Sequence, residues 1–178
     1  TQESYAVAVD VRASRTSLMF TDSIGNPISD ILSFPTESDI NRFVVSLSRQ
    51  IKKNFPPNIA GSRCEGIGIV VPGMLNRKTG FVLRAPTLGW KDVDLLTPLQ
   101  NEFEGIEIHL ENSGKACALS QIWMKRNDFP FSNDIVFVSI SDGVGVGVVI
   151  NGEVMRGKHN TAGEFGHIPL SIDGLPCS

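Results

Sequence analysis

The chain has no excess of basic residues. Its 178 residues include 16 Lys and Arg against 19 Asp and Glu, which gives a formal net charge of −3. Binding to the phosphate backbone of a nucleic acid depends on a cationic surface. We therefore expect that this chain alone binds neither DNA nor RNA.

Long apolar runs and paired cysteines are also missing. No stretch approaches the ~20 apolar residues of a membrane-spanning helix, so we expect no membrane association. The start Thr1–Tyr5 is polar and does not follow the pattern of a signal peptide. Three scattered cysteines, Cys64, Cys117 and Cys177, argue against a disulfide framework and predict a reducing, cytoplasmic setting. We interpret Cys64 and Cys117 as small buried apolar residues.

The beginning of the chain predicts a β-meander followed by a helix. Apolar, β-branched runs predict three strands joined by short turns, at Tyr5–Val11, Thr16–Thr21 and Ile28–Phe34. Glu37–Phe55 carries apolar residues at helical spacing, with Thr36 or Ser38 as its candidate N-cap. With 41% hydrophobic and 20% charged residues, the composition is that of a globular protein.

Later segments alternate between strands and helices. The continuous apolar run Glu65–Val71 predicts a strand buried on both faces. The other predicted segments are a short extended stretch at Phe81–Leu83, helices at Val93–Phe103 and Gly114–Lys125, and strands at Ile106–Glu111, Asp134–Ser141, Val144–Ile150 and Glu153–Met155. This order predicts an α/β layer fold with a mixed sheet. We expect a first lobe over residues 1–128 and the start of a second over 134–178, with Phe129–Asp134 as linker.

Four motifs follow one another in a fixed order along the chain. They read GIGIVVPGMLNRKTGFVLRAPTLGW (Gly66–Trp90), HLENSGKACAL (His109–Leu119), SDGVGVGVVINGEVMRG (Ser141–Gly157) and AGEFGH (Ala162–His167). Together they resemble the ROK family of repressors, open reading frames and sugar kinases. The resemblance implies an actin-like, ribonuclease-H-like fold, a three-layer α/β arrangement in two lobes with sugar bound between them. It also implies that the second lobe is truncated here.

The positions that serve ATP and phosphoryl transfer in ROK kinases are altered. The family's Asp-x-Gly-Gly-Thr turn is DVRAS here (residues 10–14), and its Gly-Thr-Gly-x-Gly loop is SDGVG (residues 141–145), with a carboxylate that would repel phosphate. The catalytic Asp of the kinases is replaced by Ser113, whose hydroxyl has no useful basicity near neutral pH. The resemblance thus implies no catalytic residue, and ATP is not expected. The surviving glycines fit either hairpin geometry or nucleotide binding; they are Gly143, Gly145 and Gly147.

The sugar-facing positions of the family persist. They are Gly73, Asn112, Glu164 and His167. An amide donates and accepts hydrogen bonds and a carboxylate accepts them from vicinal hydroxyls, so these groups suit a sugar. The resemblance implies the sugar-sensing domain of a ROK transcriptional regulator, a dimer or tetramer that binds DNA through a helix-turn-helix absent from this chain. The alternatives are an active kinase for a hexose or N-acetylhexosamine and a structural domain that binds no small molecule.

The family's zinc site is present only in part. In the resemblance, the zinc ligands are His167 and three cysteines of a Cys-x-Cys-Gly-x-x-Gly-Cys run, and Cys177 is the first of these. Because structural zinc needs four N or S ligands, we expect zinc in the longer protein and none in this chain.

Some of the motif residues have a second interpretation. Asn112 or Ser113 could cap the following helix rather than serve a ligand. Lys115 is interpreted as a solvated helix residue, although it could reach an anionic ligand. Trp90 is expected to anchor its loop, and Trp123 to lie in the core or at an interface.

Overall fold

Three antiparallel strands come first among the described elements, as the apolar, β-branched runs predict. They are β1 (Ser4–Val11), β2 (Arg15–Asp22) and β3 (Leu32–Pro35), and Val9 lies opposite Leu18 in the β1–β2 register. The third strand is shorter than the predicted Ile28–Phe34. The Phe20 N–H donates to the Ser29 hydroxyl at 3.0 Å, so a side chain occupies the place of a backbone acceptor and the ladder begins later.

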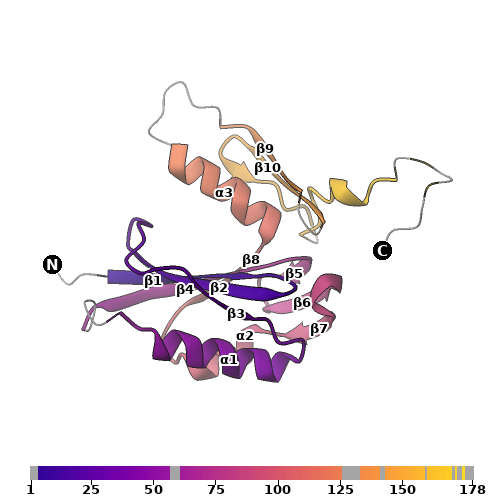
Figure 1. Ribbon diagram of the computed structural model, residues 1–178. Helices are drawn as coiled ribbons and strands as arrows, with labels where there is room; N and C mark the ends of the chain where they lie inside the picture. Colours follow the sequence, from indigo (N-terminus) through magenta and orange to yellow (C-terminus); the bar gives the residue numbers. More distant parts are fainter. Residues whose placement is uncertain are drawn as a thin grey trace. The chain divides into compact units, whose positions relative to one another are not determined.

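The structure describes residues 4–56, 61–125, 133–140, 143–158, 160–169, 171 and 174. The chain forms two compact units, Thr1–Ser113 and Gly114–Ser178 (Figure 1). The predicted linker Phe129–Asp134 lies largely outside the described residues, and the predicted lobes 1–128 and 134–178 stay a prediction. Along the described stretches, no helix is both long enough and apolar enough to cross a membrane.

Helix α1 (Ile40–Lys53) follows the meander. Its apolar face is buried through Phe43, Val44, Leu47 and Ile51. The N-cap is Asp39, whose carboxylate accepts a hydrogen bond from the Arg42 N–H at 2.9 Å. The predicted caps Thr36 and Ser38 are wrong, because the helix begins at Ile40 rather than at the predicted Glu37.

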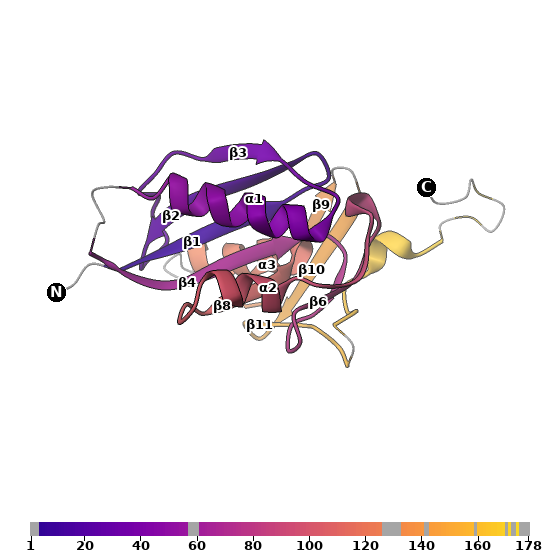
Figure 2. The same cartoon turned by 90° about the horizontal axis from the view of Figure 1, so that it is seen from below.

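Two parallel strands complete the main sheet of the first unit. The sheet has five strands in the order β3-β2-β1-β4-β8, with β4 (Arg63–Val71) parallel to both β1 and β8 (Ile108–Asn112). Helices α1 and α2 (Leu96–Glu102) cover one face of this sheet (Figures 1 and 2). Strand β4 is not buried on both faces as predicted: Ile67 and Ile69 are buried, but Gly68 is exposed.

A small second sheet follows β4 and was not predicted as a sheet. It consists of β5 (Met74–Asn76), β6 (Phe81–Ala85) and β7 (Trp90–Asp94), all antiparallel, with a short 3-10 helix, η2 (Pro86–Leu88), before β7. Val93 therefore lies in a strand rather than in the predicted helix Val93–Phe103. Helix α2 starts after it, where the Thr97 N–H donates to the Asp94 carboxylate at 3.0 Å.

The second unit consists of α3 packed on a three-stranded antiparallel sheet (Figure 1). Its elements are α3 (Ser113–Lys125), β9 (Ile135–Ile140), β10 (Val144–Ile150), β11 (Glu153–Val154) and the 3-10 helix η3 (Phe165–His167). Asn151 and Gly152 form the turn that joins β10 to β11, with φ values of 53° and 78°, which a tight hairpin turn requires. Ala118, Val149 and Val154 form the core of this unit.

Glycines allow α3 to lie directly against β10. A Cβ on Gly114 would lie 2.9 Å from the Val146 carbonyl, and a Cβ on Gly147 would overlap the Gly114 carbonyl. The glycine Gly147 is therefore required for helix–sheet packing, whereas Gly143 has no heavy atom within 4 Å of such a Cβ. Other side chains of the β9–β10 pair are exposed and apolar, among them Val136, Val138, Ile140 and Val144.

Candidate functional site

The first pair of predicted site residues meets at the carboxyl ends of two parallel strands. Asn112 is the last residue of β8 and lies opposite Val71, the last residue of β4. Its side-chain Nδ2 donates to the carbonyl oxygen of Gly73 at 2.8 Å. Polar groups at the carboxyl ends of parallel strands are a common place for ligand binding in open α/β sheets.

Gly73 has a backbone conformation and close neighbours that exclude a residue with a side chain. Its φ is +96°, in the left-handed region that favours glycine. A Cβ there would overlap the carbonyl of Arg84 and lie 2.9 Å from Cα of Ala85, in strand β6. The glycine therefore lets the chain turn tightly after β4 and brings its carbonyl to Asn112.

Sequence reasoning missed Arg77, which supports the same region. Its Nε donates to the carbonyl of Leu110 at 3.3 Å and lies 3.4 Å from a carboxylate oxygen of Glu111. Glu111 also accepts from the backbone N–H of Asn112 at 3.0 Å. A lone arginine in a turn carries no spacing signal, so only the fold reveals that Arg77 and Glu111 brace Asn112.

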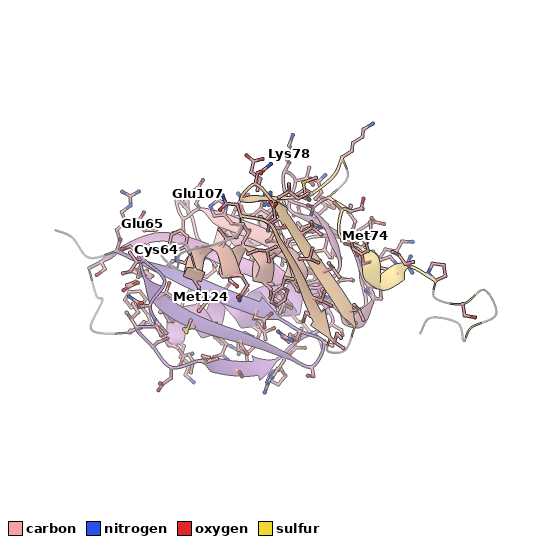
Figure 3. All side chains as sticks on the ribbon, turned by 90° about the horizontal axis from the view of Figure 1, so that it is seen from above. Cys64, Glu65, Met74, Lys78, Glu107 and Met124 are labelled. Atoms are coloured by element: carbon pink, nitrogen blue, oxygen red, sulfur yellow. The ribbon has the colours of Figure 1, made fainter. Side chains whose placement is uncertain are left out.

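An apolar hollow lies elsewhere in the first unit. It has a volume of about 370 Å³ and is lined by Tyr5, Phe55 and Phe103, among others. Cys64, which also lines it, lies at the amino end of β4, whereas Met74 lies beyond the carboxyl end of that strand (Figure 3). The hollow is therefore distant from Asn112 and is not part of the candidate site.

The second pair of predicted site residues lies on a glycine-containing segment of the second unit. Gly163 has φ +88°, and a Cβ there would lie 2.8 Å from the carbonyl of Val146. A Cβ on Gly166 would overlap the carbonyl of Val144. The two glycines thus let the segment that carries Glu164 and η3 run close along the backbone of β10.

Glu164 and His167 come together across one turn. The imidazole Nε2 of His167 lies 3.8 Å from one carboxylate oxygen of Glu164, with side-chain exposures of 73% and 32%. The His167 N–H donates to the Glu164 carbonyl at 3.2 Å, which fixes the spacing of the two residues. Both side chains are accessible and polar, so each can exchange hydrogen bonds with a hydroxylated ligand.

Lys115 is buried, and the prediction of a solvated helix residue is wrong. Its side chain is 1% exposed, and its ammonium lies 4.0 Å from the second carboxylate oxygen of Glu164. The spacing of α3 could not show this, because the groups that cover Lys115 include a segment ~45 residues later in the chain, at Asn160.

The altered phosphate positions are only partly described by the structure. Asp10, near the end of β1, forms an ion pair at 2.8 Å with Arg12, just after the strand, so the guanidinium already has an anionic neighbour. Ser113 is the first residue of α3 and directly follows Asn112. Ser141 and Asp142 lie outside the described residues.

The described part of the chain does not test the predicted zinc site. Among the described side chains, no three from His, Cys, Asp and Glu gather in a group that could hold a metal ion. His167 offers one accessible imidazole, and Cys177 lies outside the described residues. Zinc ligation by His167 and Cys177 therefore stays a prediction.

The remaining singled-out residues have ordinary surroundings. Trp90 anchors its segment, although this segment is the start of β7 rather than the predicted loop: its indole N–H donates to the Ser38 carbonyl at 2.8 Å. Trp123 is 55% exposed, so the core alternative is wrong and the interface alternative stays a prediction. Cys64 and Cys117 are half-buried.

Comparison with known proteins gives one family. A model described as the ROK family matches residues 11–178. A putative xylose repressor of Caldicellulosiruptor sp. (strain Rt8B.4) is 32% identical over 177 residues, covering 97% of this chain and 43% of the repressor. A glucokinase of Halalkalibacterium halodurans is 28% identical over 182 residues, covering 99% of this chain and 53% of the glucokinase. The chain thus spans about half the length of these curated relatives.

A solved structure establishes the fold. The crystal structure of a ROK family transcriptional regulator, a homolog of the E. coli MLC protein, superposes with a TM-score of 0.80 at 21% identity, over 98% of this chain and 43% of the regulator. The expected actin-like, ribonuclease-H-like α/β fold, with a mixed sheet that begins as a β-meander, is confirmed.

Proposed function

Because the chain belongs to the ROK family, we propose that it is the sugar-binding effector domain of a transcriptional regulator and has no kinase activity. The observation that carries this proposal is Ser113. It follows Asn112 directly, at the position where ROK kinases have the aspartate that takes a proton from the sugar hydroxyl. A serine hydroxyl cannot take that proton at neutral pH. The 32% identity to a putative xylose repressor supports the same branch.

The phosphate-binding positions support the absence of catalysis. In the turn after β1, Arg12 and Ala13 replace the family's glycines, so side chains occupy space through which backbone amides approach phosphate. Arg12 is paired with Asp10 at 2.8 Å, which reduces its attraction for an added anion. We propose that ATP is not a ligand.

The sugar contacts would come from the four retained positions. Glu164 accepts hydrogen bonds from vicinal hydroxyls, and His167 and Asn112 add donor and acceptor groups. Gly73 and its neighbours hold the Asn112 amide in a fixed orientation. A sugar that binds one state of the whole regulator more tightly than another shifts the population toward that state, which is how an effector controls DNA binding.

The wider setting is also part of the proposal. DNA would be bound by a helix-turn-helix elsewhere in the whole protein, which acts as a homodimer or homotetramer in the cytoplasm. Zinc would be held by His167, Cys177 and further cysteines of the whole protein, as a structural ion that fixes this segment. Metal analysis of the whole regulator tests this point, and a protein purified without chelator but free of zinc would contradict it.

Calorimetric titration of the 178-residue chain with xylose, glucose and N-acetylglucosamine tests the sugar proposal. We expect one sugar to bind, and Glu164→Gln and His167→Ala to weaken it by about tenfold or more, since each removes a hydrogen bond to a charged or polar group. The matched control is His109→Ala, because the His109 side chain is 62% exposed and its imidazole lies 3.4 Å from the Glu107 carboxylate, outside the four proposed sugar contacts. No binding of any sugar would favour a structural domain instead.

An active sugar kinase is the second candidate, favoured by the 28% identity to a glucokinase along 99% of this chain. An assay that couples ADP formation to NADH oxidation separates the two functions. We expect no sugar-dependent ADP from the whole protein with hexoses or N-acetylhexosamines. Sugar-dependent turnover would overturn the regulator proposal.

A further inference from the structure

Lys115 is a buried cation that the proposed sugar contacts do not use. It lies in the first turn of α3, and its side chain is 1% exposed. Lysine is rarely buried to this extent, because removal of an ammonium from water is costly unless hydrogen bonds and a counter-charge offset the loss. The neighbours of Lys115 therefore indicate what its burial achieves.

One neighbour is the backbone of the segment that leads to η3. The Lys115 ammonium donates to the carbonyl oxygen of Asn160 at 2.8 Å. Asn160 has φ 59°, an uncommon conformation for a residue with a Cβ. A charge-assisted hydrogen bond to its carbonyl holds the chain in this turn.

A second neighbour is the carboxylate of Glu164. Its Oε1 lies 4.0 Å from Nζ of Lys115, and its Oε2 lies 3.8 Å from Nε2 of His167. Lys115 approaches from the buried side, whereas His167 is 73% exposed. The same ammonium thus donates a hydrogen bond to Asn160 and attracts the carboxylate of Glu164. Both ends of the segment Asn160–Glu164 therefore interact with one side chain of α3.

We propose that Lys115 is a positioning residue, which fixes Asn160–Glu164 against α3 and orients the Glu164 carboxylate for its ligand. The part that concerns the ligand rests on the proposed sugar-binding function. Because the ammonium is buried and already donates to the Asn160 carbonyl, it acts through Glu164 rather than by contact with an anionic ligand. The positive charge of Lys115 also offsets the negative charge of Glu164, and a site without net charge suits a neutral sugar.

Hydrogen exchange in the ligand-free chain tests the first half of this proposal. Lys115→Met keeps most of the side-chain length and removes the charge, and replacement of a buried charge by an apolar group of similar size is often tolerated. We expect faster amide exchange across residues 160–167 by about tenfold, with the β1–β4 amides unchanged. Lys115→Gln is the second variant, should Lys115→Met fold poorly, and Lys158→Met, at an exposed lysine of the same unit, is the matched control. Unchanged exchange in the Lys115 variants would overturn the proposal.

A double-mutant cycle on sugar affinity tests the second half. We expect Lys115→Met to weaken binding by about tenfold in the wild-type background and by less than about threefold in the Glu164→Gln background, because its effect passes through the carboxylate. Lys115→Arg, which keeps the charge, should restore at least part of the affinity. Equal losses in both backgrounds would show a general structural role and contradict the proposal. If the wild-type chain binds no sugar, the proposed function fails, while the exchange experiment still decides whether Lys115 fixes the segment.

Discussion

Tyr5 makes the stability of the first unit decrease with rising pH in the alkaline range. Its side chain is 9% exposed, and its ring packs edge-on against Phe55 with centroids 5.3 Å apart. The pKa of Tyr5 is raised from 10.0 to about 12, mainly by burial and to a smaller extent by the charge of Cys64 and a hydrogen bond with it. The folded state therefore favours the neutral phenol, so this stability is complete below pH 10 and is lost as the pH rises toward 12.

The substitution Tyr5→Phe keeps the ring and removes the titration. Between pH 9 and pH 11, we expect the free energy of unfolding of the wild type to fall by roughly 1 kcal/mol more than that of Tyr5→Phe. Urea titrations at the two pH values measure this difference. Identical pH dependence of the two proteins would show that Tyr5 titrates alike in the folded and unfolded states.

Gly147 provides a test of the contact between α3 and β10. A Cβ at this position would overlap the Gly114 carbonyl and lie 2.6 Å from Cβ of Ala118. We expect Gly147→Ala to lower the free energy of unfolding of the second unit by about 1–3 kcal/mol, the usual cost of overpacking. The control Gly143→Ala has space for its methyl group and should change stability by no more than ~0.5 kcal/mol. Thermal unfolding measures both, and equal effects would contradict the packing role.

The site residues differ in how far the sequence could predict them. Gly73, Asn112, Glu164 and His167 belong to local motifs, and the structure brings each pair together within its own unit. Lys115 could not be interpreted in the same way. Its burial depends on Asn160, and helical spacing contains no information about a loop so far along the chain.

At the scale of single elements, the N-cap of α1 can be tested by substitution. The Asp39 carboxylate accepts from the Arg42 N–H at 2.9 Å and satisfies a donor that the first turn leaves free. We expect Asp39→Ala to lower the free energy of unfolding by about 1 kcal/mol. Circular dichroism during urea unfolding measures the loss. Ser38→Ala is the control and should have little effect; a larger effect at Ser38 would restore the cap expected from the sequence.

The elements that the sequence predicted are those with a repeating pattern. β1 and β2 alternate buried and accessible residues, and α1 carries its apolar residues on one face. The sheet β5–β6–β7 was missed because its strands have only 3 to 5 residues, too few to show a period. Val93 precedes Leu95, Leu96 and Leu99, and its position also fits the helical spacing of these apolar residues. The sequence pattern therefore assigned it to the helix.

At the scale of the whole molecule, the two units have unequal cores. Among the described residues, the core of the first unit extends from Tyr5 to Leu110 and includes several aromatic rings. The core of the second unit is a small cluster around Ala118, Val149 and Val154. Because stability depends on buried apolar area, we expect the amides of β9 and β10 to exchange at lower urea concentrations than those of β1 and β4. Simultaneous exchange in both sheets would show that the chain unfolds as one cooperative body.

The placement of the two tryptophans gives each unit its own optical reporter. Trp90 is 2% exposed in the first unit, with Phe43 at a ring-centroid distance of 5.0 Å, and Trp123 is 55% exposed in the second. An indole shielded from water emits at shorter wavelength than one in contact with it. In a Trp123→Phe protein, the wavelength of the emission maximum would report the unfolding of the first unit alone. The difference between this spectrum and that of the wild type would report the unfolding of the second unit.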